Sequence, residues 1–444
     1  MSAADDLREK QEHLARLHAL SALKVPLPNP GEVYHPQHID RKKDKESGEW
    51  VFWRAKGTVE NLVNLVNAYG VRVRYNELSR DIEISVNGNV LVGELSRNTN
   101  LTRLEDLCKI NGYPYEHVTK NIFSLAELDA YNPALEWIRS KPWDHQRRSE
   151  QLFECLDLAD PSQYEIAGRL FRKWLLGSVA ILCGKASKFE HVLVLVDENG
   201  GVGKTRFFES LCPEQWRASG VTLDVNNKDS VLQVVSKWLV ELGEINATFS
   251  RSDIEALKAF LSRSSDEVRP PYARAANCYP RRTAFFGSVN NARFLVDDTN
   301  NRRFWPIEVE AVNYQHDIDM QQVWAEALHC VEHGESWHLT ADENRAIGEY
   351  NDSFRAMDRV EESIRRLYDE QGTPNRWLSA TEVLEEIGIS QPKRPDVLKA
   401  RAILRPRFDS RVWRKVTQYH MPPKLMQGSY MYPVRGGYAD ESPL

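Results

Sequence analysis

Short, fully apolar runs between His191 and Glu310 constrain this chain more than any other feature. They read VLVLV, WLVEL, TAFFGSV and FWPIEVE, and amphipathic segments separate them. Strands of a parallel sheet are buried on both faces and have this continuous apolar character, because crossover helices cover the sheet. The pattern therefore predicts an α/β core with helices on both faces of a mostly parallel sheet.

The composition is that of a globular protein. The chain has 444 residues, of which 41% are hydrophobic and 27% charged, enough for two or three domains and unlike a disordered chain. No apolar run approaches the roughly 20 residues of a membrane-spanning helix, and the charged N-terminus is unlike a signal peptide. Six scattered cysteines indicate reduced core thiols. We expect a soluble intracellular protein without a membrane partner.

The first apolar run is followed by a candidate phosphate-binding loop. VLVLV predicts a strand, DENGGVGKT a turn and RFFESL the start of a helix. In such loops backbone N–H groups point at nucleotide phosphates, the lysine reaches the β- and γ-phosphates, and the following hydroxyl binds Mg²⁺. The predicted ATP-binding residues are Asn199, Gly200, Gly201, Val202, Gly203, Lys204, Thr205 and Arg206.

This loop departs from the usual G-x-x-x-x-G-K-[ST] pattern. Glu198 occupies the position of the first glycine, while three later glycines still allow close backbone approach. A carboxylate beside the turn is expected to weaken nucleotide binding. The alternative is an ordinary turn that caps a helix.

Polar residues follow the next apolar runs where ligands bind in open α/β sheets. Glu241 and Glu244 emerge near the end of WLVELGEI, one to hold Mg²⁺ and the other to orient water, or else both as surface glutamates. Asn290 follows TAFFGSV and suits a sensor of the γ-phosphate or the attacking water. Arg302 and Arg303 precede FWPIEVE and suit charge neutralisation on a γ-phosphate of the same or a neighbouring subunit, or surface ion pairs.

The regions around this core have other patterns. We predict an N-terminal helical arm over residues 1–30, a small α+β module over 31–130, a helical segment over 131–190, the ATPase core over 191–350 and a basic C-terminal domain over 360–444. In the α+β module Thr58 caps a helix that Gly70 ends, and VRVRYN and DIEISV form a hairpin.

The C-terminal region combines a short helix-turn-helix pattern with basic and aromatic residues. LSATEVLEEIGIS predicts the two helices, and residues 392–435 contain eleven Lys/Arg against two acids, a net of about +9. Aromatic side chains interleave this charge, as in a surface that stacks on bases. The pattern predicts a winged-helix-like module that binds DNA; the alternative is a solvated basic face.

Five motifs together resemble one family. GGVGKT, WLVELGEI, SDIEALKAFLSRSSDEVRPPYAR, FFGSVN and NNRRFWPI occur in this order, and the stretch of about residues 130–310 is similar to the virulence-associated protein E family. That family is a branch of the AAA+ P-loop ATPases close to the superfamily 3 DNA helicases of phages and mobile elements. The N-terminal module is less diagnostic, and the sequence has no catalytic primase domain.

The resemblance implies a ring, expected to have six subunits, that uses ATP and Mg²⁺ to move along single-stranded or forked DNA. It assigns Lys204 and Thr205 to the phosphate loop, Thr205 and Glu241 to the metal, and Asn290 to the sensor. One of Arg302 and Arg303 then acts in the next subunit's site, and Arg269, Tyr272 and Arg274 grip DNA in the pore. It also implies the bacterial host cytoplasm and a separate primase or other replication proteins as partners.

Two functions follow from these observations. The first is an ATP-dependent DNA helicase, translocase or replication initiator of a phage or mobile element. The second is a DNA-binding regulatory ATPase switch without unwinding activity, which Glu198 favours because slow hydrolysis suits a switch. A small-molecule phosphotransferase would need an acceptor pocket for which the sequence has no motif, and it would leave the basic tail unexplained.

Overall fold

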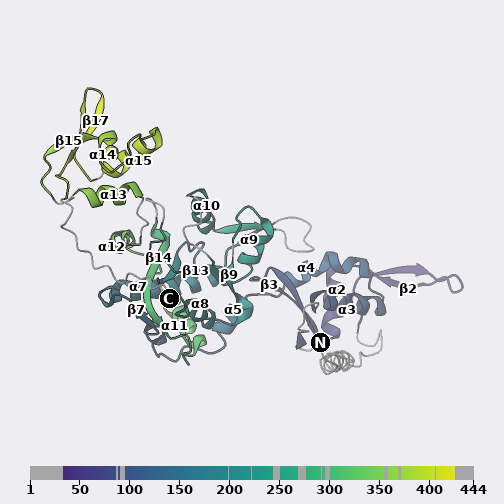
Figure 1. The fold of residues 1–444 in the computed structure, drawn as a ribbon. Coiled ribbons are helices and arrows are strands. Elements are labelled where there is room, and N and C mark those ends of the chain that lie inside the picture. The colour runs from purple at the N-terminus through teal and green to yellow at the C-terminus, as the bar shows by residue number, and fades with distance from the viewer. Residues whose placement is uncertain are drawn as a thin grey trace, which may run out of the picture. The chain divides into compact units, whose positions relative to one another are not determined.

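The computed structural model of the chain is shown in Figure 1. It describes residues 34–86, 89–90, 96–198, 200–221, 223–243, 251–268, 277–291, 293–295, 301–354, 359–368, 372–405 and 407–425. The chain divides into two compact units, Met1–Ala292 with Arg302–Glu349, and Arg293–Asn301 with Tyr350–Leu444. Among the described helices, none is both long and apolar enough to cross a membrane.

The N-terminal part of the first unit is a small α+β structure. Its elements are β1 (Ile39–Lys43), β2 (Trp50–Ala55), α2 (Val59–Ala68), β3 (Val71–Asn76), β4 (Asp81–Val86), β5 (Asn89–Val90), α3 (Ser96–Ile110), α4 (Val118–Glu127) and β6 (Ala130–Tyr131). β3 and β4 form the predicted antiparallel hairpin in a sheet of order β5-β4-β3-β6. Thr58 caps α2 by accepting the Asn61 N–H, as predicted, and Gly70 follows with φ 63°.

The next elements connect this part to the central sheet. They are α5 (Pro133–Ile138), α6 (Arg148–Phe153), β7 (Leu156–Leu158) and α7 (Tyr164–Leu182). The segment 131–190, predicted to be helical, thus also contains a strand, and β7 forms one edge of the central sheet, where it pairs antiparallel with its neighbour. The sequence pattern missed β7 because Leu-Asp-Leu is too short to show a period.

The central sheet has six strands in the order β7-β14-β8-β13-β10-β9. Its strands and the helices around it are β8 (Val192–Val196), α8 (Lys204–Ser210), β9 (Arg217–Val221), α9 (Lys228–Val235), β10 (Leu239–Leu242), α10 (Arg251–Leu261), β11 (Ser265–Val268), β12 (Asn277–Pro280), β13 (Ala284–Val289), β14 (Phe304–Val312), α11 (Met320–Glu332) and α12 (Ala341–Asp352). All neighbours except β7 and β14 are parallel. The predicted mostly parallel α/β sheet is therefore confirmed, and β11 and β12 form a separate antiparallel pair.

The sheet core is built from large side chains that also satisfy their polar atoms. All five residues of β8 are fully buried. The indole N–H of Trp174 on α7 donates to the Phe285 carbonyl at 2.8 Å, and that of Trp238 donates to the Ser178 carbonyl at 2.9 Å. These bonds fix α7 against the sheet, because a buried donor without a partner costs free energy.

The chain order of the strands creates a switch point at β8. The chain runs from β8 to the far edge at β9, returns through β10 and β13, and then crosses to β14 on the other side of β8. Ligands of open α/β sheets bind at the carboxyl ends of the strands beside such a switch point. The fold therefore directs attention to the loop after β8.

The second unit contains a smaller core. Its elements are α13 (Arg359–Leu367), β15 (Arg376–Ser379), α14 (Ala380–Glu386), α15 (Arg394–Leu404), β16 (Ser410–Trp413) and β17 (Val416–Met421). β16 and β17 form a hairpin, and β17 also pairs with β15. Ile364, Val383, Leu384 and Leu404 are fully buried in its core. The sequence analysis predicted two helices within LSATEVLEEIGIS. The structure has one helix there, α14, and the second helix, α15, starts later at Arg394.

Candidate functional site

The loop after β8 adopts a conformation that only glycine accommodates well. Gly200, Gly201 and Gly203 have φ of 73°, 85° and 92°. A Cβ atom on Gly203 would also lie 2.3 Å from Cδ1 of Tyr314. Positive φ is costly for other residues, so the three glycines let the chain turn tightly into α8. Helix α8 then begins at Lys204.

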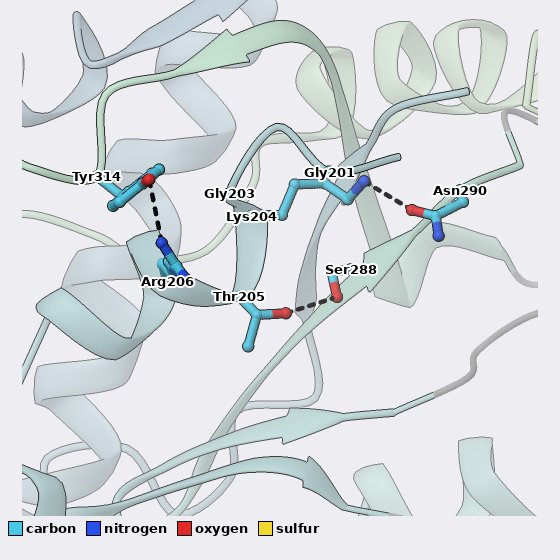
Figure 2. A pocket seen from close by; sticks show the side chains of 8 residues that line it. All are labelled: Gly201, Gly203, Lys204, Thr205, Arg206, Ser288, Asn290 and Tyr314. Carbon is cyan, nitrogen blue, oxygen red and sulfur yellow. Dashed lines mark hydrogen bonds between the residues drawn. The ribbon is translucent and has the colours of Figure 1, made fainter. Parts of the chain in front are cut away.

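Lys204 is held between two polar side chains at the carboxyl ends of β8 and β13. Its Nζ donates to Asn290 Oδ1 at 2.8 Å (Figure 2). The same Nζ lies 3.3 Å from Asp197 Oδ2. Lys204 is 6% exposed and Asp197 2% exposed. The structure thus brings Lys204 and Asn290 together, and it adds Asp197, which the sequence analysis did not name although a polar residue directly after a buried strand could have indicated it.

Thr205 and Glu241 meet on the other side of the loop. The Thr205 hydroxyl donates to Glu241 Oε1 at 2.9 Å, and the Ser288 hydroxyl donates to the same oxygen at 2.6 Å. The backbone N–H of Gly220 donates to Glu241 Oε2 at 3.0 Å. Glu241 is 2% exposed, so these three donors compensate the burial of its carboxylate. Sequence reasoning missed Ser288, which lies two residues before Asn290 on β13.

This oxygen cluster suits a hard divalent cation. A threonine hydroxyl and a carboxylate are ligands that Mg²⁺ accepts, and Mg²⁺ usually keeps several waters and bridges to phosphate oxygens. No group of three or more His, Cys, Asp or Glu side chains able to hold a metal occurs among the described residues. Thr205 and Glu241 therefore fit a cation shared with a phosphate ligand better than a closed metal cage.

A pocket of about 460 Å³ opens over these groups. The residues that line it are Gly201, Gly203, Lys204, Thr205, Arg206, Ser288, Asn290 and Tyr314 (Figure 2). Tyr314 follows β14 and was not identified from the sequence; its hydroxyl accepts from Arg206 Nη1 at 3.2 Å. Glycine backbone, a lysine and hydroxyl groups facing one cavity can bind a phosphate chain.

Glu198 lies beside β14 and outside the set of residues that line the pocket. Its side chain is exposed. Burial raises the pKa of Glu308 on β14, and the negative charge of Glu198 raises this pKa further. The electrostatic neighbour of Glu198 is therefore a strand residue, and its exposed carboxylate is well placed to be screened by water.

Arg302 and Arg303 lie at the opposite end of the sheet from Lys204. They precede Phe304, which pairs with Val192 at the start of β8, whereas the loop follows Val196 at its end. Four strand residues separate these positions, about 13 Å along the sheet. Arg303 is bound by Glu190 and Ser262, with Nε 3.1 Å from Glu190 Oε2, whereas Arg302 is exposed. The structure does not bring either arginine into its own subunit's pocket.

Several predicted site residues fall outside the described residues. These are Asn199 of the loop, Glu244 after β10, and Arg269, Tyr272 and Arg274 between β11 and β12. Val202 is described and lies between two positive-φ glycines without lining the pocket.

Comparison with known families agrees with the motif order. Residues 138–356 match the virulence-associated protein E-like domain. This confirms the resemblance drawn from the five motifs, and the match begins in α5 and extends through the whole central sheet. No curated protein matches the chain.

Several solved structures also match this chain. The apo structure of the NrS-1 C-terminal region has a TM-score of 0.43 and 13% identity, and the similarity covers 81% of this chain and 98% of that chain. An A form apo structure of the same region has a TM-score of 0.43 and 15% identity over 81% and 98% of the two chains. A further A form structure has a TM-score of 0.42 and 11% identity over 82% and 98%.

Proposed function

Residues 138–356 match a virulence-associated protein E-like domain, and from this premise we propose that the chain is an ATP-hydrolysing AAA+ enzyme. In this proposal it moves along DNA as a hexameric ring during replication of a phage or mobile element. The observation that carries the proposal is the meeting of Lys204, Asn290, Thr205 and Glu241 around one pocket at the switch point of the sheet.

Each side chain has a role in this proposal. Lys204 gives up its hydrogen bond to Asn290 and binds the β- and γ-phosphates. Asn290 is then free to orient the attacking water. Thr205 and Glu241 would hold Mg²⁺, which would neutralise phosphate charge when bound. Asp197, with Oδ2 3.3 Å from Lys204 Nζ, orients the ammonium group at the site.

The arginine that completes the site comes from the neighbouring subunit. Arg302 and Arg303 lie at the opposite end of the sheet from their own pocket, and Arg303 is engaged by Glu190 and Ser262. Exposed Arg302 is therefore the better candidate for an arginine finger acting in trans. This separates two residues that sequence reasoning left equivalent.

The second unit supports a DNA partner. Its order of helix, strand, two helices and hairpin is that of a winged-helix-like module. On the sheet the Arg411 guanidinium lies 4.2 Å from the ring centroid of Trp377, and Trp413 is 54% exposed at the hairpin. Exposed aromatic rings beside arginines suit contacts with bases and phosphates.

Steady-state ATP hydrolysis tests the proposal directly. We expect Lys204→Ala to reduce hydrolysis at least about 100-fold, because a donor to the transferred phosphoryl group is lost. Lys237→Ala is the matched control, since Lys237 is half-buried and donates to the Gln215 carbonyl. Assays at low salt with and without single-stranded DNA preserve phosphate contacts. Equal rates for wild type and Lys204→Ala would overturn the proposal.

Mixing two inactive variants tests the subunit interface. Lys204→Ala retains Arg302, and Arg302→Ala retains the phosphate loop, so mixed rings regain some sites with both groups intact. We expect the mixture to recover hydrolysis that neither variant has alone. If hydrolysis recovers when Lys204→Ala is mixed with Arg303→Ala but not with Arg302→Ala, Arg303 is the arginine finger. If neither mixture recovers hydrolysis, the result argues against a finger in trans.

A regulatory switch is the second candidate function. The contacts that occupy Lys204, with Asn290 at 2.8 Å and Asp197 at 3.3 Å, must open before it reaches a phosphate, which suits slow turnover. Displacement of a strand from a forked duplex distinguishes the two functions. ATP-dependent displacement supports the motor, whereas DNA binding controlled by ATP without displacement supports the switch.

A further inference from the structure

The antiparallel hairpin β1–β2 gathers aromatic and basic side chains on one face. Arg41 pairs with Phe52, and Lys43 pairs with Trp50. Cross-strand partners point to the same side, and so do residues two apart on one strand, so these four side chains share a face. Trp50 is 62% exposed and Phe52 56% exposed, and the Lys43 ammonium lies 5.8 Å from the Trp50 ring centroid.

The opposite face differs in carrying the acidic residue of β1, Asp40. There Lys42 pairs with Val51, and Asp40 pairs with Arg54. The Asp40 carboxylate is 3.0 Å from Arg54 Nε and 3.6 Å from Lys56 Nζ. The Asp40 carboxylate is thus directed away from the face that carries Arg41 and Phe52. A register shift between Asp40 and Arg41 leaves Trp53 as an extra residue, also exposed, with the Arg54 guanidinium 4.6 Å from its ring.

The turn and the base hold this ribbon in shape. In the turn, the Asp44 carboxylate accepts the backbone N–H groups of Glu46 and Ser47. At the base, the buried Asn61 side chain accepts the N–H groups of Gln37 and His38 and donates to the carbonyls of His38 and Lys56. The hairpin (β2 in Figure 1) therefore projects from α2 as a fixed element rather than as a loop.

We propose that the face formed by Arg41, Lys43, Trp50 and Phe52 binds single-stranded nucleic acid. Bases stack on the two exposed rings, and the two cations contact the phosphates. This inference rests on the proposed function only in assuming that the protein works on DNA. The face itself includes no residue of the ATP site. It adds a nucleic-acid contact in the N-terminal part, far along the sequence from the C-terminal module.

The spacing of the rings favours a single strand over a duplex. Trp50 and Phe52 are two residues apart on one strand, about 6.7 Å. Bases in a duplex rise about 3.4 Å per nucleotide and are already stacked on each other. Rings at twice that spacing suit unpaired bases, each stacked on its own aromatic side chain.

Two other partners fit less well. Insertion of the hairpin tip into a membrane would bury the turn, residues 44–49, whose sequence DKESGE is almost entirely charged or polar. A protein or second copy covering this face would have to supply carboxylates to both Arg41 and Lys43. A polyanion with flat apolar groups matches both features of the face at once.

The test compares the two faces of the same hairpin in the full-length chain. Lys43→Ala/Trp50→Ala removes one cation and one apolar side chain from the proposed face, and Lys42→Ala/Val51→Ala removes the same kinds from the opposite face. Binding of a labelled oligothymidylate is measured by anisotropy at low salt. We expect the first variant to lose about tenfold in affinity and the second less than about twofold.

Single substitutions separate charge from stacking. Lys43→Ala should lower the slope of log affinity against log salt by about 0.7, since one phosphate contact is lost, whereas Trp50→Ala should lower affinity without changing the slope. Photo-cross-linking with iododeoxyuridine in the oligonucleotide should yield adducts at Trp50 or Phe52. This readout is independent of other DNA contacts in the chain.

The outcomes distinguish this inference from the proposed function. Equal affinities of both double variants, or adducts only elsewhere, would overturn the inference while DNA-stimulated hydrolysis could still stand. Specific adducts on the hairpin without any ATP hydrolysis would overturn the proposed function and keep the inference. If only the sedimentation of Lys43→Ala/Trp50→Ala changes, the face is a contact between copies of the chain. If this variant instead loses binding to vesicles, the face contacts a membrane. Either result would overturn the inference.

Discussion

The central sheet and the β1–β2 hairpin use the same residue types in opposite ways. Trp238 beside β10 is fully buried and satisfies its indole N–H, whereas Trp50 on β2 is 62% exposed. Lys204 is enclosed by two polar partners, whereas Lys43 is exposed next to a ring. The difference teaches that a tryptophan or lysine in the sequence does not by itself indicate a core or a binding site. Its burial and its contacts in the folded structure decide which role it has. Exposed apolar side chains that gather on one face indicate a partner.

The largest expected effect is on the stability contributed by the two tryptophans. Trp238→Ala should lower the free energy of unfolding by about 4 kcal/mol, because it leaves a cavity in the core and removes the hydrogen bond from the indole to the Ser178 carbonyl. Trp50→Ala should change it by less than about 0.5 kcal/mol. Chemical denaturation of both variants measures the contrast. Similar losses for both would mean that the hairpin is packed in solution and would remove the comparison.

A second test compares a buried ion pair beside the central sheet with an exposed ion pair on the hairpin. Arg281 donates to both oxygens of Asp266, at 2.5 and 3.1 Å, and both residues are buried. Arg281→Ala should lower the free energy of unfolding by about 3 kcal/mol, because Asp266 stays buried after it loses both short contacts with Arg281, and Arg80 is more distant. Arg54→Ala removes the exposed partner of Asp40 and should leave the unfolding midpoint unchanged. An Arg281→Ala variant as stable as wild type would contradict the role of burial.

Lowering the pH should destabilise the core through His191. Burial beside Trp305, whose ring centroid lies 4.1 Å away, lowers the pKa of His191 to about 4. Between this value and the unfolded pKa of about 6.5 the unfolded chain binds more protons, so stability falls as pH decreases from about 6.5 towards 4, by up to about 3 kcal/mol.

His191→Phe provides the control for this pH effect. A phenyl ring can keep the stacking on Trp305 but cannot take up a proton. The wild type should therefore lose stability relative to His191→Phe as the pH falls. Denaturation of both proteins at several pH values measures this change. A constant difference would show that His191 is protonated equally in both states.

The smallest effect is expected at Tyr314. Tyr314→Phe removes the hydroxyl contact with Arg206 at 3.2 Å but keeps the ring beside Gly203. The KM for ATP should rise by less than about fivefold with kcat unchanged, since one hydrogen bond to a charged group is lost. A large fall in kcat would instead place the hydroxyl in the reaction.

Much of the central sheet was predictable, and the reason is burial on both faces. β8, β10, β13 and β14 coincide with the four apolar runs because a strand between two helical layers contacts no water. β9, with the sequence RASGV, and β7, with LDL, lie at the edges and have no such signal. The hairpin β1–β2 was missed for a related reason, since IDRKK and WVFWRA are exposed on both faces and show no alternation.

The sequence alone determined the local chemistry of this protein. The glycines of the loop, Lys204 and Thr205 after a buried strand, and the carboxylate and amide at the ends of two later strands are all encoded within short segments, because backbone conformation and burial act over a few residues. Only the tertiary structure decided that Asp197 and Ser288 join these groups, that Arg302 and Arg303 lie at the opposite end of the sheet, and that Trp50 and Phe52 share a face with two cations. Strand order and register bring together residues that are distant in the chain, and no local pattern specifies either.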